Sequence, residues 1–254
     1  MSATIPSIWI PYTIVASLND TFQFEEEGTG HMTVTLTPGT YNNPSALIAQ
    51  VATDMDARAV ALGGFGGYVG TFDTATGKNY IDGSGTTFEI YTSSPASTNI
   101  NSVLGFTQTA GTGDFVVEDY SDVQPLNYWS PGIPPSKDDH EQIKYVAGQS
   151  VSLAGYNKHI KFGKRIERTI EFMHLPVYKV VQSEEGTYVN ESFDRVWDGM
   201  KGKFRWYEDR TMENDGLYHP DYFLIDPVDT LKRDRLDRHA PFYSLDLTFG
   251  KFVG

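Results

Sequence analysis

The sequence predicts a mainly β protein built from two β-sandwich or jelly-roll-like units, each of which carries one short or medium-length helix. Aromatic residues make up 13% of the 254 residues, and 24 glycines and 13 prolines accompany them. Aromatic side chains favour strands, while glycine and proline favour turns. Helical periodicity is confined to one segment in each half, so short strands joined by frequent turns account for most of the chain.

Residues 1–124 form the predicted first unit, which is acidic and contains a clearly alternating strand. Met32, Val34 and Leu36 are separated by threonines, and a Pro-Gly turn follows them. Alternate side chains of a strand point to opposite faces, so this pattern is typical of a half-buried strand. Further short strands are predicted around YVGTF, KNYI, TTFEIYT and DFVVEDY, with Thr-Gly and Asp-Gly-Ser-Gly turns between them.

A helix is predicted over residues 44–62 of this unit. Asn43 is a good N-cap, and Pro44 suits the first helical position because the N–H that it lacks would have no helical partner. Gly63 and Gly64 supply the stop. The apolar stripe repeats at i, i+3 and i+4: Leu47, Ile48, Val51, Ala52, Met55, Ala59 and Leu62.

Residues 125–138 contain four prolines and are predicted to link the two units, because little regular structure survives that density.

The second unit, residues 139–254, is predicted to be a β-sandwich with a short helix over 190–199, capped by Asn190. In FYSLDLTF, residues 242–249, apolar and other side chains alternate. Few residues follow this strand, so we expect its edge to be open to another chain.

The net charge of −13 is unevenly distributed. Residues 1–135 carry 13 acids and only two bases, Arg58 and Lys78, whereas residues 136–254 carry 20 acids and 18 bases. A nucleic-acid-binding protein needs a basic face, so we expect no sequence-specific nucleic-acid partner. The contrast between the two halves also supports two separate units.

Several kinds of chemistry lack the residues that they need. Cysteine is absent, which excludes disulfides, thiol catalysis and cysteine-ligated zinc. The sequence GGFGGYVG, 63–70, follows a helix and lacks the third glycine of a dinucleotide loop, so it is interpreted as a turn. No histidine has HExxH or HxH spacing, and the acids before His219 are interpreted as a solvated loop. No cofactor, metal or catalytic residue is predicted.

Targeting and membrane signals are also missing. No apolar run approaches the roughly 18–20 residues of a membrane helix, and the N-terminus lacks a basic region followed by an apolar stretch. We therefore expect no membrane partner. The absence of cysteine leads us to expect maturation in a reducing cytoplasm.

Two stretches of the second unit indicate assembly. KFRWYEDR, 203–210, places rings and charges on a short strand, and KRDRLDRH, 232–239, alternates sign almost residue by residue. Opposed charges fix the register and orientation of subunits more than they add affinity. The candidate residues for an assembly interface are Phe204, Trp206, Arg233, Arg235, Tyr243, Leu245 and Phe249.

The order of these segments resembles structural proteins of tailed-bacteriophage virions. GKFRWYED, YFLI and the closing FYSLDLTF are similar to the C-terminal part of tail and baseplate subunits, and PGTYNNPSALIAQV followed by INSVLGF resembles a jelly-roll module of virion proteins. The resemblance implies a non-enzymatic subunit of a tail, neck or baseplate that forms a cyclic homo-oligomer through its C-terminal domain. It also implies other virion proteins as partners and a location in the virion after synthesis in the host cytoplasm.

Two alternatives remain open. The first is a jelly-roll module that recognises a host glycan through exposed rings: Tyr68, Tyr80, Tyr91, Tyr128 and Trp129. The second is a hydrolase that uses paired carboxylates. Glu208 and Asp209 are adjacent, so on a strand they would point to opposite faces, which weakens them as a catalytic pair.

Overall fold

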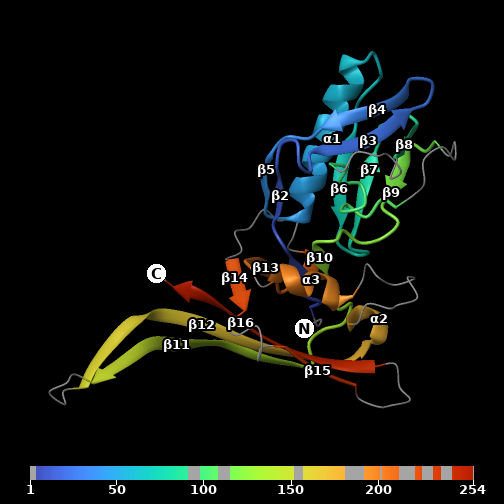
Figure 1. Ribbon diagram of the computed structural model, residues 1–254. Helices are drawn as coiled ribbons and strands as arrows, with labels where there is room; N and C mark the ends of the chain where they lie inside the picture. Colours follow the sequence, from blue (N-terminus) through green and yellow to red (C-terminus); the bar gives the residue numbers. More distant parts are fainter. Residues whose placement is uncertain are drawn as a thin grey trace.

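The computed structural model describes residues 4–90, 98–107, 115–151, 157–180, 192–200, 202–211, 221–224, 231–235 and 242–253. Within these residues the chain is mainly β and its strands pair antiparallel, which confirms the predicted fold class. Figure 1 shows two bodies. One holds the long helix α1 (Pro44–Ala61), and the other is built on one large sheet.

The first body contains three small antiparallel sheets beside α1. Their strands are β4 (Gly30–Thr35), β3 (Thr21–Glu26) and β8 (Phe88–Ile90) in one sheet, β6 (Val69–Asp73), β7 (Lys78–Asp82) and β9 (Glu118–Tyr120) in another, and β2 (Tyr12–Ile14) with β5 (Gly39–Tyr41) in the third. The predicted alternation in β4 is confirmed, because Met32 and Val34 are buried while their neighbours are exposed.

Helix α1 forms as its sequence predicts. The side chain of Asn43 accepts a hydrogen bond from the backbone N–H of Ala46 at 2.6 Å, and Pro44 is the first helical residue. The apolar stripe faces the core, with Ile48, Val51 and others fully buried. Gly70 of β6 makes close packing possible, because a Cβ there would lie 2.3 Å from the carbonyl oxygen of Ile48.

The second body is an eight-stranded sheet with two helices near it. The order is β10–β1–β13–β14–β16–β12–β11, and β15 pairs with β16 beside this path. The strands are β1 (Ser7–Trp9), β10 (Tyr128–Trp129), β11 (Lys137–Val151), β12 (Asn157–Pro176), β13 (Phe204–Tyr207), β14 (Asp221–Leu224), β15 (Leu231–Arg235) and β16 (Phe242–Val253), and the helices are α2 (Val177–Val180) and α3 (Phe193–Met200).

The boundaries between the bodies differ from the predicted ones. Strand β1 lies within the predicted first unit, yet it pairs with β10 and β13 in the large sheet. The proposed linker, 125–138, contributes β10, and Trp129 is fully buried with its indole N–H donated to the backbone oxygen of Lys179 at 2.9 Å. Prolines flank this short strand without interrupting it. The predicted helix 190–199 is found as α3, and its proposed cap Asn190 lies outside the described residues.

Strand β1 also joins the two bodies. Ile8 belongs to the core of the large sheet, while Trp9 belongs to the core around α1, as expected for adjacent residues that point to opposite faces. The indole N–H of Trp9 donates to the backbone oxygen of Tyr41 at 3.1 Å. Because one three-residue strand contributes to both cores, the bodies are packed against each other rather than tethered.

The terminal strand β16 occupies the interior of the sheet, which corrects the expectation of an open edge. It pairs with β12 along its whole length, from Phe242 to Val253. On its other side β15 pairs with the stretch Tyr243–Leu247, and β14 pairs with Phe249 and Gly250. Strands β14 and β15 therefore cover the edge of β16 that the sequence analysis expected to be open.

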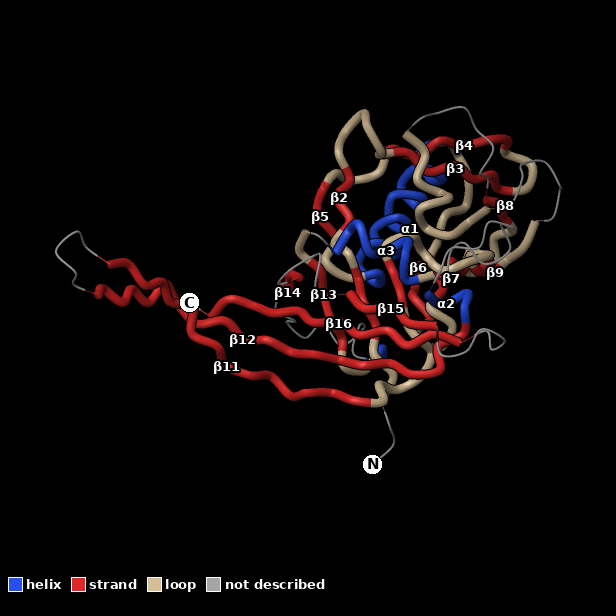
Figure 2. Tube along the Cα trace, turned by 60° about the horizontal axis from the view of Figure 1, so that its bottom comes forward, coloured by secondary structure: helices blue, strands red, loops and turns tan. Residues whose placement is uncertain are grey.

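The strands β11 and β12 form a long hairpin that continues past the rest of the sheet. The last pair between β12 and β16 is Lys164 with Val253, whereas β12 remains paired with β11 as far as Asn157 with Val151. Figure 2 shows this two-stranded extension projecting from the body, and Figure 1 shows it from another side. Residues 144–151 and 157–163 are named the arm below.

Candidate functional site

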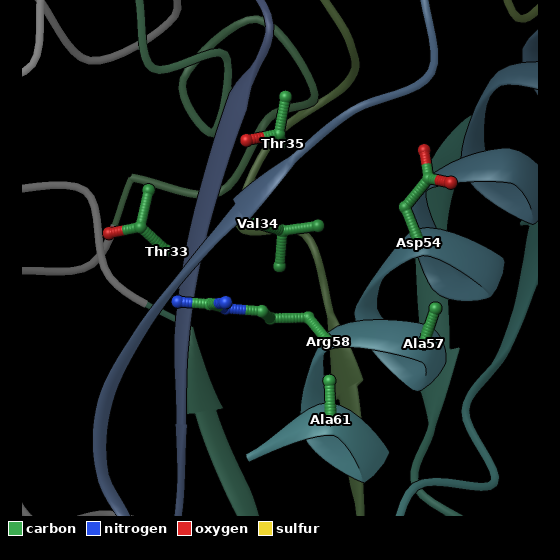
Figure 3. Close-up of a pocket in the computed structure, with 7 residues that line it drawn as sticks. All are labelled: Thr33, Val34, Thr35, Asp54, Ala57, Arg58 and Ala61. Carbon is green, nitrogen blue, oxygen red and sulfur yellow. The ribbon is translucent and has the colours of Figure 1, made fainter.

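A groove of about 510 Å³ lies between α1 and the edge strand β4. It is lined by Thr33, Val34, Thr35, Asp54, Ala57, Arg58 and Ala61. Figure 3 shows Arg58 reaching from the helix across β4 towards Thr33, with Asp54 one turn earlier on the same helix.

The two charged side chains of the groove, Asp54 and Arg58, differ in their interactions with the rest of the protein. The carboxylate of Asp54 accepts hydrogen bonds from the backbone N–H of Thr37 at 2.7 Å and from the side chain of Gln50 at 2.9 Å. It therefore holds the turn before β5 in place. Within the described residues no acidic side chain pairs with Arg58. The groove thus offers one cation and threonine hydroxyls, and the one carboxylate that lines it, Asp54, already accepts hydrogen bonds from within the protein.

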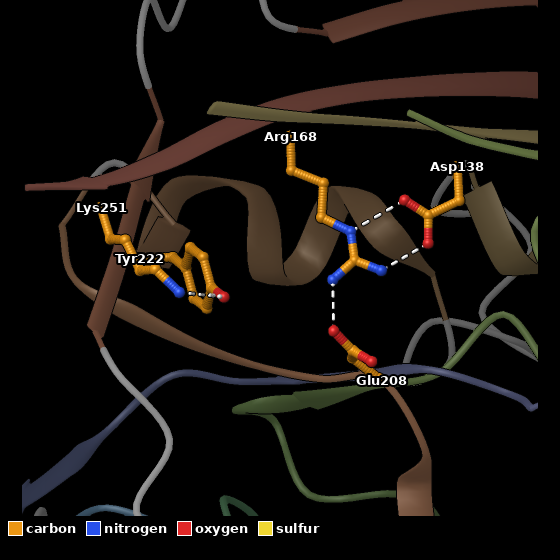
Figure 4. Close-up of polar contacts among 5 residues, drawn as sticks. All are labelled: Asp138, Arg168, Glu208, Tyr222 and Lys251. Atoms are coloured by element: carbon orange, nitrogen blue, oxygen red, sulfur yellow. Dashed lines mark hydrogen bonds and ion pairs between the residues drawn. The ribbon is translucent and has the colours of Figure 1, made fainter. Parts of the chain in front are cut away.

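A buried ion-pair cluster lies in the second body (Figure 4). The guanidinium of Arg168 on β12 is only 8% exposed, and its Nε donates to Oδ1 of Asp138 on β11 at 2.8 Å while its Nη2 pairs with Oδ2. Its Nη1 donates to Oε1 of Glu208, just after β13, at 2.7 Å. The cluster therefore ties three segments of the sheet together.

Electrostatics keep this arginine charged. Burial opposes protonation, but hydrogen bonds and Coulomb attraction from Asp138 and Glu208 outweigh it and raise the pKa of Arg168 above its ordinary value. A permanently charged, doubly paired arginine is not a proton-transfer group. We interpret the cluster as structural.

The glycine-rich turn after α1 binds the carboxylate of Glu26 from the same chain. The carboxylate of Glu26 accepts hydrogen bonds from the backbone N–H groups of Phe65 at 3.0 Å and Gly66 at 3.3 Å, and from the hydroxyl of Tyr68 at 2.9 Å. Glu26 is 1% exposed. Successive N–H groups form an anion-binding concavity, and here an internal carboxylate fills it. Residues 63–68 of the predicted turn lie outside helix and strand, while Val69 and Gly70 begin β6, and the contact with Glu26 is a role that the sequence did not indicate.

The outer face of the β6–β7–β9 sheet combines tyrosines with acids. The strand register places Val69, Asp82 and Glu118 in one row and Thr71, Tyr80 and Tyr120 in the next. The two tyrosine rings lie 4.5 Å apart, and Tyr120 is 52% exposed. These six residues are named the tyrosine face. Partial burial, the hydrogen bond to Glu118 and the charge of Asp82 raise the pKa of Tyr80 to about 12.

The opposite side of the same strand holds a protonatable acid. Asp119 pairs with the fully buried Ile81. Burial, and after it the negative charges of Asp122 and Glu89, raise the pKa of Asp119 to about 6. Asp122 already accepts the backbone N–H of Thr107 at 2.6 Å. Asp119 is therefore a carboxyl group in a mostly apolar and negative environment, and no cation among the described residues offsets its burial.

Most of the predicted assembly residues lie in the core. Phe204, Trp206, Leu245 and Phe249 are at most 2% exposed, and the rings of Trp206 and Phe249 pack at a tilt with their centroids 5.1 Å apart. Tyr243 is partly buried against the same core. The structure brings these five together in one sheet, as the sequence led us to expect, but it assigns the four buried side chains to packing within one chain.

The two arginines of the assembly prediction lie on β15. Arg233 pairs with Leu245 and Arg235 with Tyr243 along the backbone of β16. Residues 236–239 of the alternating charged run lie outside the described residues. The strand β15 therefore lies beside the candidate residues of β16, and the interface role of its arginines stays a prediction.

The rings suggested for glycan binding are mostly unavailable. Tyr68 is 6% exposed, and Tyr128 and Trp129 are fully buried. Tyr91 lies outside the described residues, which leaves Tyr80 on the tyrosine face. Sequence reasoning missed its neighbour Tyr120, although the alternation in VVEDY, residues 116–120, places Tyr120 on the same face as Glu118.

The described ranges do not form a metal site, and the two carboxylates singled out in the sequence, Glu208 and Asp209, have other partners. These ranges contain no group of three histidine, aspartate or glutamate side chains suited to hold an ion. His219, Glu213 and Asp215 lie outside them. Glu208 is engaged by Arg168, and Asp209 accepts the hydroxyl and N–H of Thr211, so each has a structural partner.

No family model matches the sequence, and no curated protein or solved structure matches it either. Among the described helices, none combines the length and the apolar character that crossing a bilayer would require.

Proposed function

We propose that this protein is a structural subunit that assembles with copies of itself through its β-rich second body, in the tail, neck or baseplate of a tailed-bacteriophage virion. The sequence resemblance motivates the virion setting, and the shape of the second body supports self-assembly. A catalytic role receives no support from the groove or from the buried cluster, since each charged group described there either has a structural partner or stands alone.

The observation that carries the proposal is the long hairpin. Strand β11 has 15 residues, and among the described strands it pairs with β12 alone, as the last strand of the sheet. An open edge of that length is a template for pairing with another chain, and monomeric proteins usually shorten or cover such edges. A two-stranded ribbon is marginally stable in water by itself, so we expect the arm to be stabilised by contact with a partner surface.

Self-assembly is tested by the mass of the full chain in solution. Sedimentation velocity and native mass spectrometry over a hundredfold range of concentration should show a discrete multimer that persists on dilution. A monomer at every concentration would overturn the assembly proposal.

The virion setting needs a separate measurement. Proteomic analysis of purified particles from the host that produces this chain should find it at a fixed copy number relative to the other virion proteins. Its restriction to the soluble host fraction would remove the virion from the proposal while leaving self-assembly intact.

A further inference from the structure

We propose that the arm of one copy docks on the tyrosine face of the next copy, so that the subunits join head to tail. This inference rests on the proposed self-assembly and names the two surfaces that would meet. One surface is the basic ribbon of residues 144–151 and 157–163, and the other is the outer side of the β6–β7–β9 sheet.

The arm is the basic part of an acidic protein. From Gln142 to Arg165, both included, the sequence contains five lysines and arginines and no acid, whereas the whole chain has a net charge of −13. Three of the bases, Lys144, Lys158 and Lys161, lie on the arm itself. Like charges would repel if two arms met each other, so a surface of opposite sign is the better partner.

The tyrosine face has the complementary character. It carries the carboxylates of Asp82 and Glu118 beside two rings that contact each other at a tilt of 39°, and it belongs to a first half with 13 acids and two bases. Ammonium groups are attracted both to carboxylates and to the faces of tyrosine rings. Val69 is 51% exposed and Tyr120 52%, so the face also offers apolar surface that a partner would bury. Helix α1 packs on β6 and β7 with its buried stripe, on the other side of the sheet.

Geometry favours contact between copies over contact within one copy. In Figures 1 and 2 the arm projects on one side of the molecule and β7 with β9 lies towards the other. A surface that meets a different surface on its neighbour makes a heterologous contact, which closes into a ring or continues as a filament. A contact between the arm and the tyrosine face could therefore build the ring that the proposed function requires, if the rotation between neighbouring copies closes.

A pair of charge-reversal variants tests the contact. The arm variant is K144E/K158E/K161E, and the face variant is T71K/E118K, which changes two exposed positions of strands β6 and β9. Each variant alone should sediment as a monomer under conditions in which the wild type is multimeric. Conservative K144R/K158R/K161R should keep the wild-type assembly, and circular dichroism with thermal melting should show that the variants remain folded.

Mixing gives a result that misfolding cannot imitate. The arm variant keeps an intact face and the face variant keeps an intact arm, so a one-to-one mixture should form a discrete heterodimer that grows no further. If both variants assemble like the wild type, the inference fails while self-assembly stands. If the wild type is itself monomeric, the proposed self-assembly is wrong, and the inference that rests on it is wrong as well. Binding of duplex DNA or polysaccharide that each variant loses, with assembly unchanged, would assign the surface to another ligand and overturn the inference.

Discussion

The guanidinium of Arg168 and the carboxylate of Asp138 form a two-point ion pair between β12 and β11, in the part of the hairpin where β12 also pairs with β16. Arg168 is 8% exposed and the Asp138 side chain is 25% exposed. The pair ties the two strands of the hairpin together within the sheet, because each side chain is held by the strand opposite to its own. A planar guanidinium suits such bidentate contact better than a lysine would.

Removing Arg168 should destabilise the second body more than removing either acid. Arg168→Met leaves Asp138 without its buried partner, and we expect a loss of about 2–4 kcal/mol in the free energy of unfolding. Chemical denaturation followed by tryptophan fluorescence measures it. Glu208→Gln is the matched control, because the Glu208 side chain is 66% exposed and its pair should contribute less than about 1 kcal/mol. Equal effects of the two changes would contradict this account.

The contact between Glu26 and the glycine turn predicts a steric effect at Gly64. A Cβ at this position would lie 2.2 Å from Oε2 of Glu26. Gly64→Ala must therefore displace the carboxylate from its N–H donors, and we expect a cost of about 1–3 kcal/mol in unfolding free energy. Gly63→Ala is a useful comparison, because Gly63 has a φ of 85° with open space around it and tests backbone strain alone. A smaller loss at Gly64 than at Gly63 would argue against the carboxylate contact.

Local signals explain what the sequence predicted well. The start of α1 depends on Asn43 and Pro44, which act within one turn of the helix, and its stripe is read from neighbouring residues. The alternation in β4 is equally local. Such signals survive in the structure because tertiary packing agrees with them.

Long-range pairing explains what the sequence could not provide. Strand β1 is three residues long, too short to show a period, and its partners lie about 120 and 200 residues further along the chain. The burial of Phe204 and Phe249 follows from a contact between segments distant in sequence, whereas β15 and β16, which also pair, are successive strands of the chain. Alternation identified both strands correctly but could not tell a core-facing ring from one that faces another subunit.

Asp119 should make stability depend on pH. Its pKa is about 6 in the folded protein, against an ordinary value of 3.8 that we assign to the unfolded chain. The folded chain therefore binds more protons between these two values, and stability falls as pH rises through this window. Asp119→Asn removes the titrating carboxyl group and therefore the fall in stability that its ionisation causes. At pH 7 we expect the variant to be about 1–3 kcal/mol more stable than the wild type, with no difference near pH 4. Thermal melting at both pH values measures this, and an equal gain at pH 4 would contradict the titration.

Two deletions in the second body should have opposite consequences. Truncation after Pro241 removes β16, which pairs with β12, β14 and β15, and exposes a core that includes Leu245 and Phe249. We expect this body to unfold, seen as proteolysis of residues beyond 136 and loss of near-ultraviolet dichroism. Truncation is therefore a test of folding and says nothing about an interface.

Shortening the arm should leave the fold intact. Tyr145 and Lys164 are directly paired, so replacing residues 146–163 with Asn-Gly closes the hairpin with a two-residue turn that suits an antiparallel pair. The contacts of Arg168 and the pairing of β12 with β16 lie outside the deleted residues. Denaturation should therefore show stability within about 1 kcal/mol of the wild type, while sedimentation shows a monomer. A shortened protein that remains multimeric would place the contact elsewhere on the second body.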